Sequence, residues 1–147
     1  MKIKIFVLLI ISIISISACK VTFVPNNDAA IEQQITDAAK ENDKLYLELL
    51  AASKDKRSYQ DYEKEYVQIE VEINSINLKN EARKNNKEML DIITKLHQHF
   101  TKYRNEHKER ANNLFTDAMI MDYENDMAAF WKALYFAEKN LPLTTPK

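Results

Sequence analysis

The sequence contains no glycine, and its three prolines, Pro25, Pro142 and Pro146, all lie near its ends. The 116 residues from 26 to 141 therefore lack both residue types on which tight β-turns depend. Long stretches without these residues are typical of a helical protein. Cysteine is almost as scarce: because Cys19 is the only one, an internal disulfide and a Cys-x-x-Cys-His haem attachment are both excluded.

The N-terminal segment has the three parts of an export signal. Lys2 and Lys4 supply positive charge, and an apolar run from Ile5 to Ile16, interrupted only by serines, follows them. The run is shorter than the roughly 20 residues that a membrane-spanning helix needs. Its length and flanks instead match the core of a signal peptide, which takes no part in the fold.

The four residues Ile16-Ser17-Ala18-Cys19 resemble the lipobox of bacterial lipoproteins, in which a branched apolar residue and two small residues precede an obligatory cysteine. This resemblance is confined to the signal. It implies transfer of diacylglycerol to the Cys19 thiol, cleavage after Ala18 and often acylation of the new amine. The alternative is an ordinary secretory signal with a coincidental cysteine.

Two or three acyl chains anchor a protein durably, since each buried methylene contributes about 0.8 kcal/mol. Lys20 stands where an enterobacterial inner-membrane retention signal has Asp, which favours the outer membrane if the cell has two membranes.

We therefore divide the chain into a signal peptide (1–18), a lipidated cysteine with its tether (19–27), a helical domain (28–141) and a C-terminal tail (142–147). Removal of the signal takes away Lys2 and Lys4 and leaves 19 basic and 22 acidic side chains in 129 residues, a formal charge of −3. A chain of this length can form one domain with a real core. Its nearly balanced charge argues against nucleic-acid binding.

Four stretches repeat apolar residues in steps of three and four, the spacing of a helix with one buried face. The expected starts are the Asn26-Asn27-Asp28 cluster, Ser58, a turn between Asn77 and Asn86, and Asn112-Asn113. The predicted inner positions are Ile31, Ile35, Ala38, Asn42, Leu45, Leu49 and Ala52; Tyr59, Tyr62, Tyr66, Ile69, Ile73, Ile76 and Asn80; Ala82, Asn86, Met89, Ile93, Leu96, Phe100, Tyr103 and His107; and Ile120, Tyr123, Met127, Phe130, Leu134, Ala137 and Leu141.

The four stretches have matched lengths and short connections, which predicts an all-α, antiparallel four-helix bundle. Pro142 ends the last helix. If no turn forms between the second and third stretches, the alternative is three helices, one of them long and kinked. The segment Val67–Ile73 alternates apolar and charged residues like a strand. Since the sequence offers no second strand to pair with it, we predict a helix there as well.

The sequence lacks the motifs of the common helical metal and haem sites. No glutamate has a histidine three residues later, and His-Glu-x-x-His is absent. His97 and His99 lie about 200° apart around a helix and cannot share a ligand. His107 falls on the inner face, where a hydrogen-bonded structural histidine is the favoured interpretation. A metal ion between His99 and Tyr103 is conceivable, but nothing else in the sequence supports it. We therefore expect no catalytic residue, no cofactor and no metal ligand.

Several apolar residues fall outside the predicted inner faces. Val67, Val71 and Leu78 align opposite the inner face of their helix, and Leu47 and Leu50 lie off the inner face of the first helix. In the last helix Met121 and Phe136 project away from the inner face, and Trp131 and Tyr135 flank it. These residues, with Val67, Val71 and Leu78 first, are candidates for a surface that contacts a partner or a second copy. The alternative is that a small bundle simply tolerates scattered apolar side chains.

The sequence thus favours a lipid-anchored, non-catalytic protein of the cell envelope that acts as a helical interaction or structural module. Its expected partners are the membrane, through Cys19, and a second protein or copy. The alternative is a lipoprotein that binds a small ligand, a lipid or a metal ion between its helices. Tyr59, Tyr62, Tyr66 and the methionines of the last helix could line such a site, although aromatic and methionine rows at helical spacing usually form a core.

Overall fold

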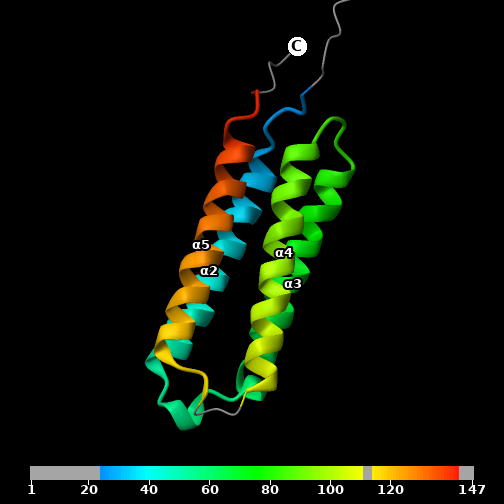
Figure 1. The fold of residues 1–147 in the computed structure, drawn as a ribbon. Helices are drawn as coiled ribbons and strands as arrows, with labels where there is room; N and C mark the ends of the chain where they lie inside the picture. Colours follow the sequence, from blue (N-terminus) through cyan, green and yellow to red (C-terminus); the bar gives the residue numbers. More distant parts are fainter. Residues whose placement is uncertain (1–23, 111–113, 143–147) are drawn as a thin grey trace, which may run out of the picture.

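The structure, a computed structural model, describes residues 24–110 and 114–142. Within these residues it contains four α-helices of 23 residues each: α2 (Ala29–Ala51), α3 (Tyr59–Glu81), α4 (Lys87–Glu109) and α5 (Asp117–Lys139). A short 3-10 turn, η1 (Lys54–Lys56), lies between α2 and α3. Successive helices run in opposite directions and pack side by side, and α5 closes the bundle against α2 (Figure 1). The predicted antiparallel four-helix bundle is confirmed.

Polar side chains fix the starts of three helices. Asp28 caps α2 by accepting hydrogen bonds from the backbone N–H groups of Ala30 and Ile31. The Ser58 hydroxyl accepts from the backbone N–H of Asp61 at the start of α3 and donates to its carboxylate. Thr116 caps α5. Such caps satisfy N–H groups that have no partner within the helix, and each contributes about 1 kcal/mol.

A real turn separates α3 from α4, so the alternative of one long kinked helix is wrong. Ala82 follows the last residue of α3, and Asn85 has a positive φ of 56°, a left-handed conformation that asparagine tolerates. Ala82 is exposed, because it caps α3 rather than belonging to the inner face predicted for it. Asn86, which lies directly before α4, is buried as predicted.

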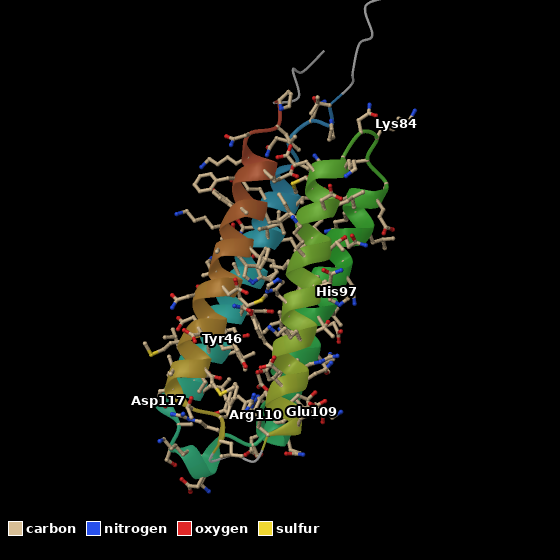
Figure 2. The ribbon with its side chains drawn as sticks, viewed as in Figure 1. Tyr46, Lys84, His97, Glu109, Arg110 and Asp117 are labelled. Atoms are coloured by element: carbon tan, nitrogen blue, oxygen red, sulfur yellow. The ribbon has the colours of Figure 1, made fainter. Side chains whose placement is uncertain are left out.

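The core consists of one row of side chains from each helix, and α2, α3 and α4 bury nearly the predicted sets. The segment Val67–Ile73 is helical, with Ile69 and Ile73 buried. Two large side chains join the core without having been predicted. Tyr46 is fully buried and lies between the helices (Figure 2), and Phe115 is buried just before α5.

In α5 the predicted inner face is partly wrong. Trp131 is buried with 2% of its surface exposed, and Glu138 is completely buried, whereas Phe130 and Ala137 are only half-buried. The buried row steps by four residues twice, from Tyr123 to Met127 and on to Trp131, where we expected strict alternation of three and four. The helix also begins at Asp117 rather than near Asn112-Asn113, which lie outside the described residues.

The two ends of the bundle differ. The start of α2, the α3–α4 turn that carries Lys84 and the end of α5 lie together, and we call this the terminal end (Figures 1 and 2). The opposite, distal end carries η1, the end of α4 and the start of α5 at Asp117. Helices of 23 residues separate the two ends by about 34 Å. Whatever precedes α2 therefore joins the domain at the terminal end.

Candidate functional sites

The most prominent apolar surface follows the outer side of α3. Val67, Val71 and Leu78 are 49%, 57% and 68% exposed, while the opposite side of the same helix is buried. The three residues follow helical spacing and form one row, which we call the α3 stripe. A row of large apolar side chains left in water is typical of a contact surface.

The other candidate surface residues do not extend the α3 stripe. Met121 and Phe136 are about half exposed on α5, and Tyr135 is half-buried against the core. Trp131 is a core residue, so its prediction as part of a partner surface is wrong. Since α3 packs on α2 and α4, and α5 packs on the same two helices, α3 and α5 are diagonal in the bundle. Their outer sides point in opposite directions and form two separate surfaces.

A network of polar side chains closes the terminal end. The buried Glu138 carboxylate accepts hydrogen bonds from the Arg83 guanidinium and, at 2.7 Å, from the backbone N–H of Asp28. Arg83 also donates to the carbonyl of Asn26, and the backbone N–H of Asn27 donates to the carbonyl of Pro142 at 2.8 Å. The network joins the residues before α2, the α3–α4 turn and the end of α5.

Two of the three asparagines predicted at inner positions, Asn80 and Asn86, belong to this end. The Asn86 amide donates to the side-chain oxygen of Asn80 at 2.6 Å and to its backbone carbonyl at 3.2 Å, and Arg83 donates to the same side-chain oxygen. Their hydrogen bonds connect the end of α3 to the start of α4. Asn42, the third predicted asparagine, is fully buried in α2, and neither atom of its amide has a hydrogen-bond partner among the described residues.

His107 is the centre of a second network, near the distal end. Its Nε2 donates to the carbonyl of Arg57 at 2.9 Å, and its Nδ1 then accepts from the Tyr66 hydroxyl at 3.1 Å. Its ring stacks on Phe115 at 4.1 Å between ring centres. Burial lowers the pKa of His107, and the hydrogen bond to Arg57 opposes this shift only in part. The predicted structural, hydrogen-bonded histidine is confirmed.

A third polar group lies between α4 and α5, half-way along the bundle. His99 Nδ1 is 2.6 Å from Asp126 Oδ2, and the Tyr103 hydroxyl donates to the same oxygen. His99 Nδ1 and the Tyr103 hydroxyl are 3.3 Å apart. Burial, followed by the hydrogen bond to Asp126, raises the pKa of Tyr103. The sequence singled out His99 and Tyr103 but gave no sign of Asp126, which only the packing of α5 on α4 brings to them.

Tyr123 supports this group from α5. Its ring stacks on Tyr103 with the ring centres 4.0 Å apart and the planes within 10° of parallel. The Tyr123 hydroxyl donates to Glu106, and burial together with this carboxylate raises the pKa of Tyr123 to about 12. The phenol ring of Tyr103 is therefore fixed on one side by an aromatic ring that is itself held in place.

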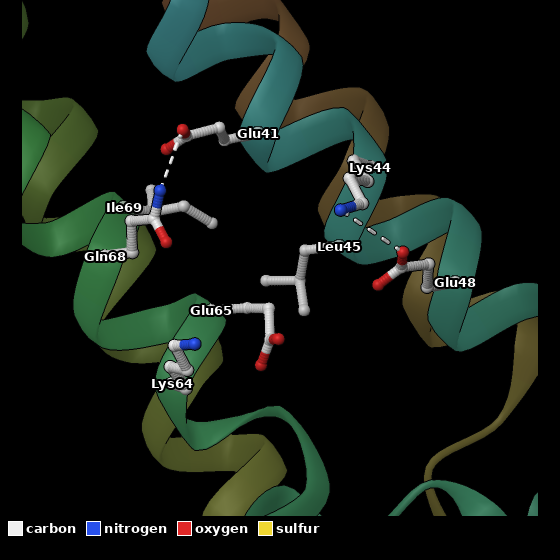
Figure 3. Close-up of a pocket in the computed structure, with 8 residues that line it drawn as sticks. All are labelled: Glu41, Lys44, Leu45, Glu48, Lys64, Glu65, Gln68 and Ile69. Atoms are coloured by element: carbon white, nitrogen blue, oxygen red, sulfur yellow. Dashed lines mark hydrogen bonds and ion pairs between the residues drawn. The ribbon is translucent and has the colours of Figure 1, made fainter.

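A pocket of about 240 Å³ opens between α2 and α3 (Figure 3). Leu45 and Ile69 contribute its apolar lining, and charged and amide side chains surround them: Glu41, Lys44, Glu48, Lys64, Glu65 and Gln68. Gln68 donates to Glu41 at 2.9 Å, and Lys44 pairs with Glu48 at 3.7 Å. With so little apolar lining, the pocket resembles an interhelical surface groove more than the largely apolar cavities that hold small molecules.

A second groove, between α2 and α5, has a volume of about 350 Å³ and a more apolar lining. Ile35 and Trp131 contribute most of its buried lining, and Lys40, Asp43 and Lys132 lie around it. Burial raises the pKa of Asp43. In size and lining this groove falls at the lower end of the range of small-molecule sites.

Within the described parts of the chain, no three histidine, cysteine, aspartate or glutamate side chains lie close enough together to bind a metal ion. Among the helices described, none combines the length and hydropathy of a membrane-spanning segment. Cys19 and the lipobox-like residues lie outside the described residues. The candidate sites are therefore the α3 stripe, the two grooves and the His99–Asp126–Tyr103 group.

Comparison of the chain with models of protein families, with curated proteins and with solved structures finds no match. Any function must therefore be argued from the residues and their arrangement.

Proposed function

We propose that this protein is a lipid-anchored, non-catalytic module of the cell envelope, and that it acts by binding another protein, or a second copy of itself, through the α3 stripe. The observation that carries this proposal is the exposure of Val67, Val71 and Leu78 on one side of a helix whose other side is fully used by the core. Burying such side chains against a partner is favourable by roughly 25 cal/mol for each Å² of apolar surface removed from water.

The anchor and the stripe are compatible in space. The residues before α2 join the bundle at the terminal end, so a lipid on Cys19 would hold this end toward the membrane. Leu78 lies three residues from the end of α3 and Val67 fourteen, which places the stripe about 5 to 21 Å from the terminal end. The surface would then face sideways, close to the membrane, where a neighbouring membrane-attached protein can reach it.

The buried polar side chains support a binding role rather than a chemical one. Arg83 and Glu138 satisfy each other, and His107 is held by hydrogen bonds at both ring nitrogens and by stacking. Groups engaged in this way stabilise helix packing and have no open side toward a substrate. A catalytic acid or base must instead reach the proton that it transfers.

A second candidate function, a lipoprotein that binds a small apolar ligand, is favoured by the groove between α2 and α5. Its apolar lining and the two lysines around it, Lys40 and Lys132, suit a ligand with an apolar body and an anionic group. Organic extraction of the purified protein followed by mass spectrometry would detect such a ligand. A protein that yields no stoichiometric small molecule would leave only the interaction module.

The variant Val71→Glu tests the interaction module. It places a charge in the middle of the α3 stripe, at a position whose exposure leaves the core untouched. The matched control is Met121→Glu, which changes an apolar residue of similar exposure (49% against 57%) on the diagonal helix. We expect Val71→Glu to lose the assembly that the full-length protein forms in mild detergent, and Met121→Glu to keep it. Assembly of unchanged size in Val71→Glu would contradict the proposal, provided that both variants retain their helicity.

A further inference from the structure

His99, Asp126 and Tyr103 bring three atoms that can bind a metal ion to one point between α4 and α5. An imidazole nitrogen, a carboxylate oxygen and a phenol oxygen form a triangle, with 2.6 Å from His99 Nδ1 to Asp126 Oδ2 and 3.3 Å from His99 Nδ1 to the Tyr103 hydroxyl. The third side is the hydrogen bond from Tyr103 to Asp126. His99 and Tyr103 are one helical turn apart on α4, so the helix itself sets their spacing.

These separations are close to those of ligands on one face of a metal ion. Nitrogen and oxygen ligands bind Zn²⁺ at about 2.1 Å, so two of them lie about 3.0 Å apart around an octahedral ion and about 3.4 Å apart around a tetrahedral one. The His99–Asp126 separation of 2.6 Å is shorter than the octahedral value by about 0.4 Å, and the His99–Tyr103 separation of 3.3 Å lies between the octahedral and tetrahedral values. We propose that these three residues form a binding site for a first-row transition-metal ion.

The surroundings hold the three ligands in place and leave the outer side open. Tyr123 stacks on the Tyr103 ring, and Phe130 packs against the His99 ring at 4.6 Å between ring centres. The side chains of His99 and Asp126 are 39% and 38% exposed. Solvent or a further ligand can therefore occupy the remaining coordination positions, as in metal sites that exchange their ion or bind a substrate.

Charge and proton balance fit an ion of this class. Asp126 is the carboxylate of the proposed site, and Glu106 is the carboxylate that accepts from the supporting Tyr123. Lys102 lies 5.3 Å from the centre of the Tyr103 ring and pairs with Glu106. Because a carboxylate oxygen only accepts, the proton between His99 and Asp126 lies on His99 Nδ1 before metal binding. On binding, this proton moves through solvent to Nε2 so that Nδ1 can coordinate the ion, and the Tyr103 phenol releases one proton to solvent. Imidazole suits zinc, copper and iron, and hard oxygen ligands are compatible with all three. The site thus differs from the α3 stripe in chemistry and in location.

The test is titration of the full-length protein in detergent with Zn²⁺, Cu²⁺ and Fe³⁺ salts, each alone. We expect one ion per chain, with Cu²⁺ bound more tightly than Zn²⁺. Fe³⁺ should produce a visible phenolate-to-iron absorption band that Tyr103→Phe abolishes. His99→Ala and Asp126→Asn should each weaken Cu²⁺ binding by at least about tenfold, the lower bound known even for residues that only support metal ligands.

His97→Ala is the matched control, because His97 lies two residues away on α4 and is 40% exposed, almost the same as His99. It should bind Cu²⁺ like the wild type, and so should Cys19→Ala, which removes the only thiol. Tyr103→Phe keeps the aromatic ring that stacks on Tyr123, so this variant removes the phenol oxygen without removing the packing of the ring. Equal Cu²⁺ affinity of His99→Ala and His97→Ala, or absence of the Fe³⁺ band in a folded wild-type protein, would overturn the proposal.

Discussion

The carboxylate of Glu138 at the end of α5 accepts hydrogen bonds from both terminal nitrogens of the Arg83 guanidinium, in the turn between α3 and α4, at 2.6 and 3.1 Å. The Glu138 side chain is completely buried, and the Arg83 side chain is 14% exposed. Because the same carboxylate accepts from the backbone N–H of Asp28, a single ion pair joins three of the segments that meet at the terminal end. This is the end to which a lipid anchor would transmit any force.

Replacing Arg83 should destabilise the bundle strongly. Arg83→Ala leaves the buried Glu138 carboxylate without its cation, and breaking a buried pair in this way costs about 3 kcal/mol or more. The control Lys84→Ala changes the neighbouring exposed residue in the same turn and should alter the free energy of unfolding by less than about 0.5 kcal/mol. Urea unfolding followed by circular dichroism measures both, and equal stabilities of the two variants would show that the ion pair has no structural role.

His107 should make stability depend on pH. Its pKa is lowered in the fold, so the unfolded chain binds the proton more readily, and stability falls as the pH drops below the unfolded value of about 6.5 toward the folded pKa. One such group contributes a slope of at most about 1.4 kcal/mol per pH unit. Denaturant unfolding measured between about pH 7.5 and about pH 5, in steps of roughly half a pH unit, gives this slope.

The variant His107→Gln carries no titrating ring and should lose this part of the slope, at some cost in stability at neutral pH. If His107→Gln instead keeps the full decrease in stability, another group is responsible for it.

The burial of Trp131 predicts that truncating two aromatic residues of α5 will lower the stability by very different amounts. Trp131→Ala should destabilise the protein by about 3 to 5 kcal/mol, because it leaves a large cavity in the core. Phe136→Ala removes a side chain that is about half exposed and should cost much less. Thermal unfolding of both variants gives the comparison. A larger loss of stability for Phe136→Ala than for Trp131→Ala would show that α5 turns the Phe136 side, not the Trp131 side, to the core.

Anchoring through Cys19 can be tested separately from any binding. The wild-type protein should fractionate with membranes, and its mature N-terminal peptide should carry the mass of a diacylglycerol on Cys19. Cys19→Ala should release the chain from the membrane fraction. Stable membrane association of Cys19→Ala, with the uncleaved N-terminus still present, would show that the apolar run itself is the anchor.

Much of the fold could be predicted from the sequence, because helical spacing and caps are local properties. Asp28 and Ser58 begin their helices as their residue types indicate, and the rows in α2, α3 and α4 follow steps of three and four. Phe130 and Trp131 are adjacent large aromatic residues, so spacing alone does not decide which faces the core. The structure buries Trp131, and the same rotation of α5 buries Glu138 opposite Arg83.

The candidate sites were predictable only where they lie on one helix. The α3 stripe could be found because Val67, Val71 and Leu78 share one side of a single helix. Asp126 could not be connected with His99, since 27 residues separate them and only packing of two helices brings them to 2.6 Å. Tyr46 was missed for another reason: it follows Leu45 directly, and both side chains are buried.

The most direct test of the central claim is photo-crosslinking from the α3 stripe in living cells. A photoreactive amino acid is introduced at Val71 in one strain and at Met121, on the diagonal helix, in another. We predict a discrete crosslinked species from position 71, identifiable by mass spectrometry as one envelope protein or as the dimer, and none from position 121. Absence of any adduct from position 71, or the same mixture of adducts from both positions, would contradict the account.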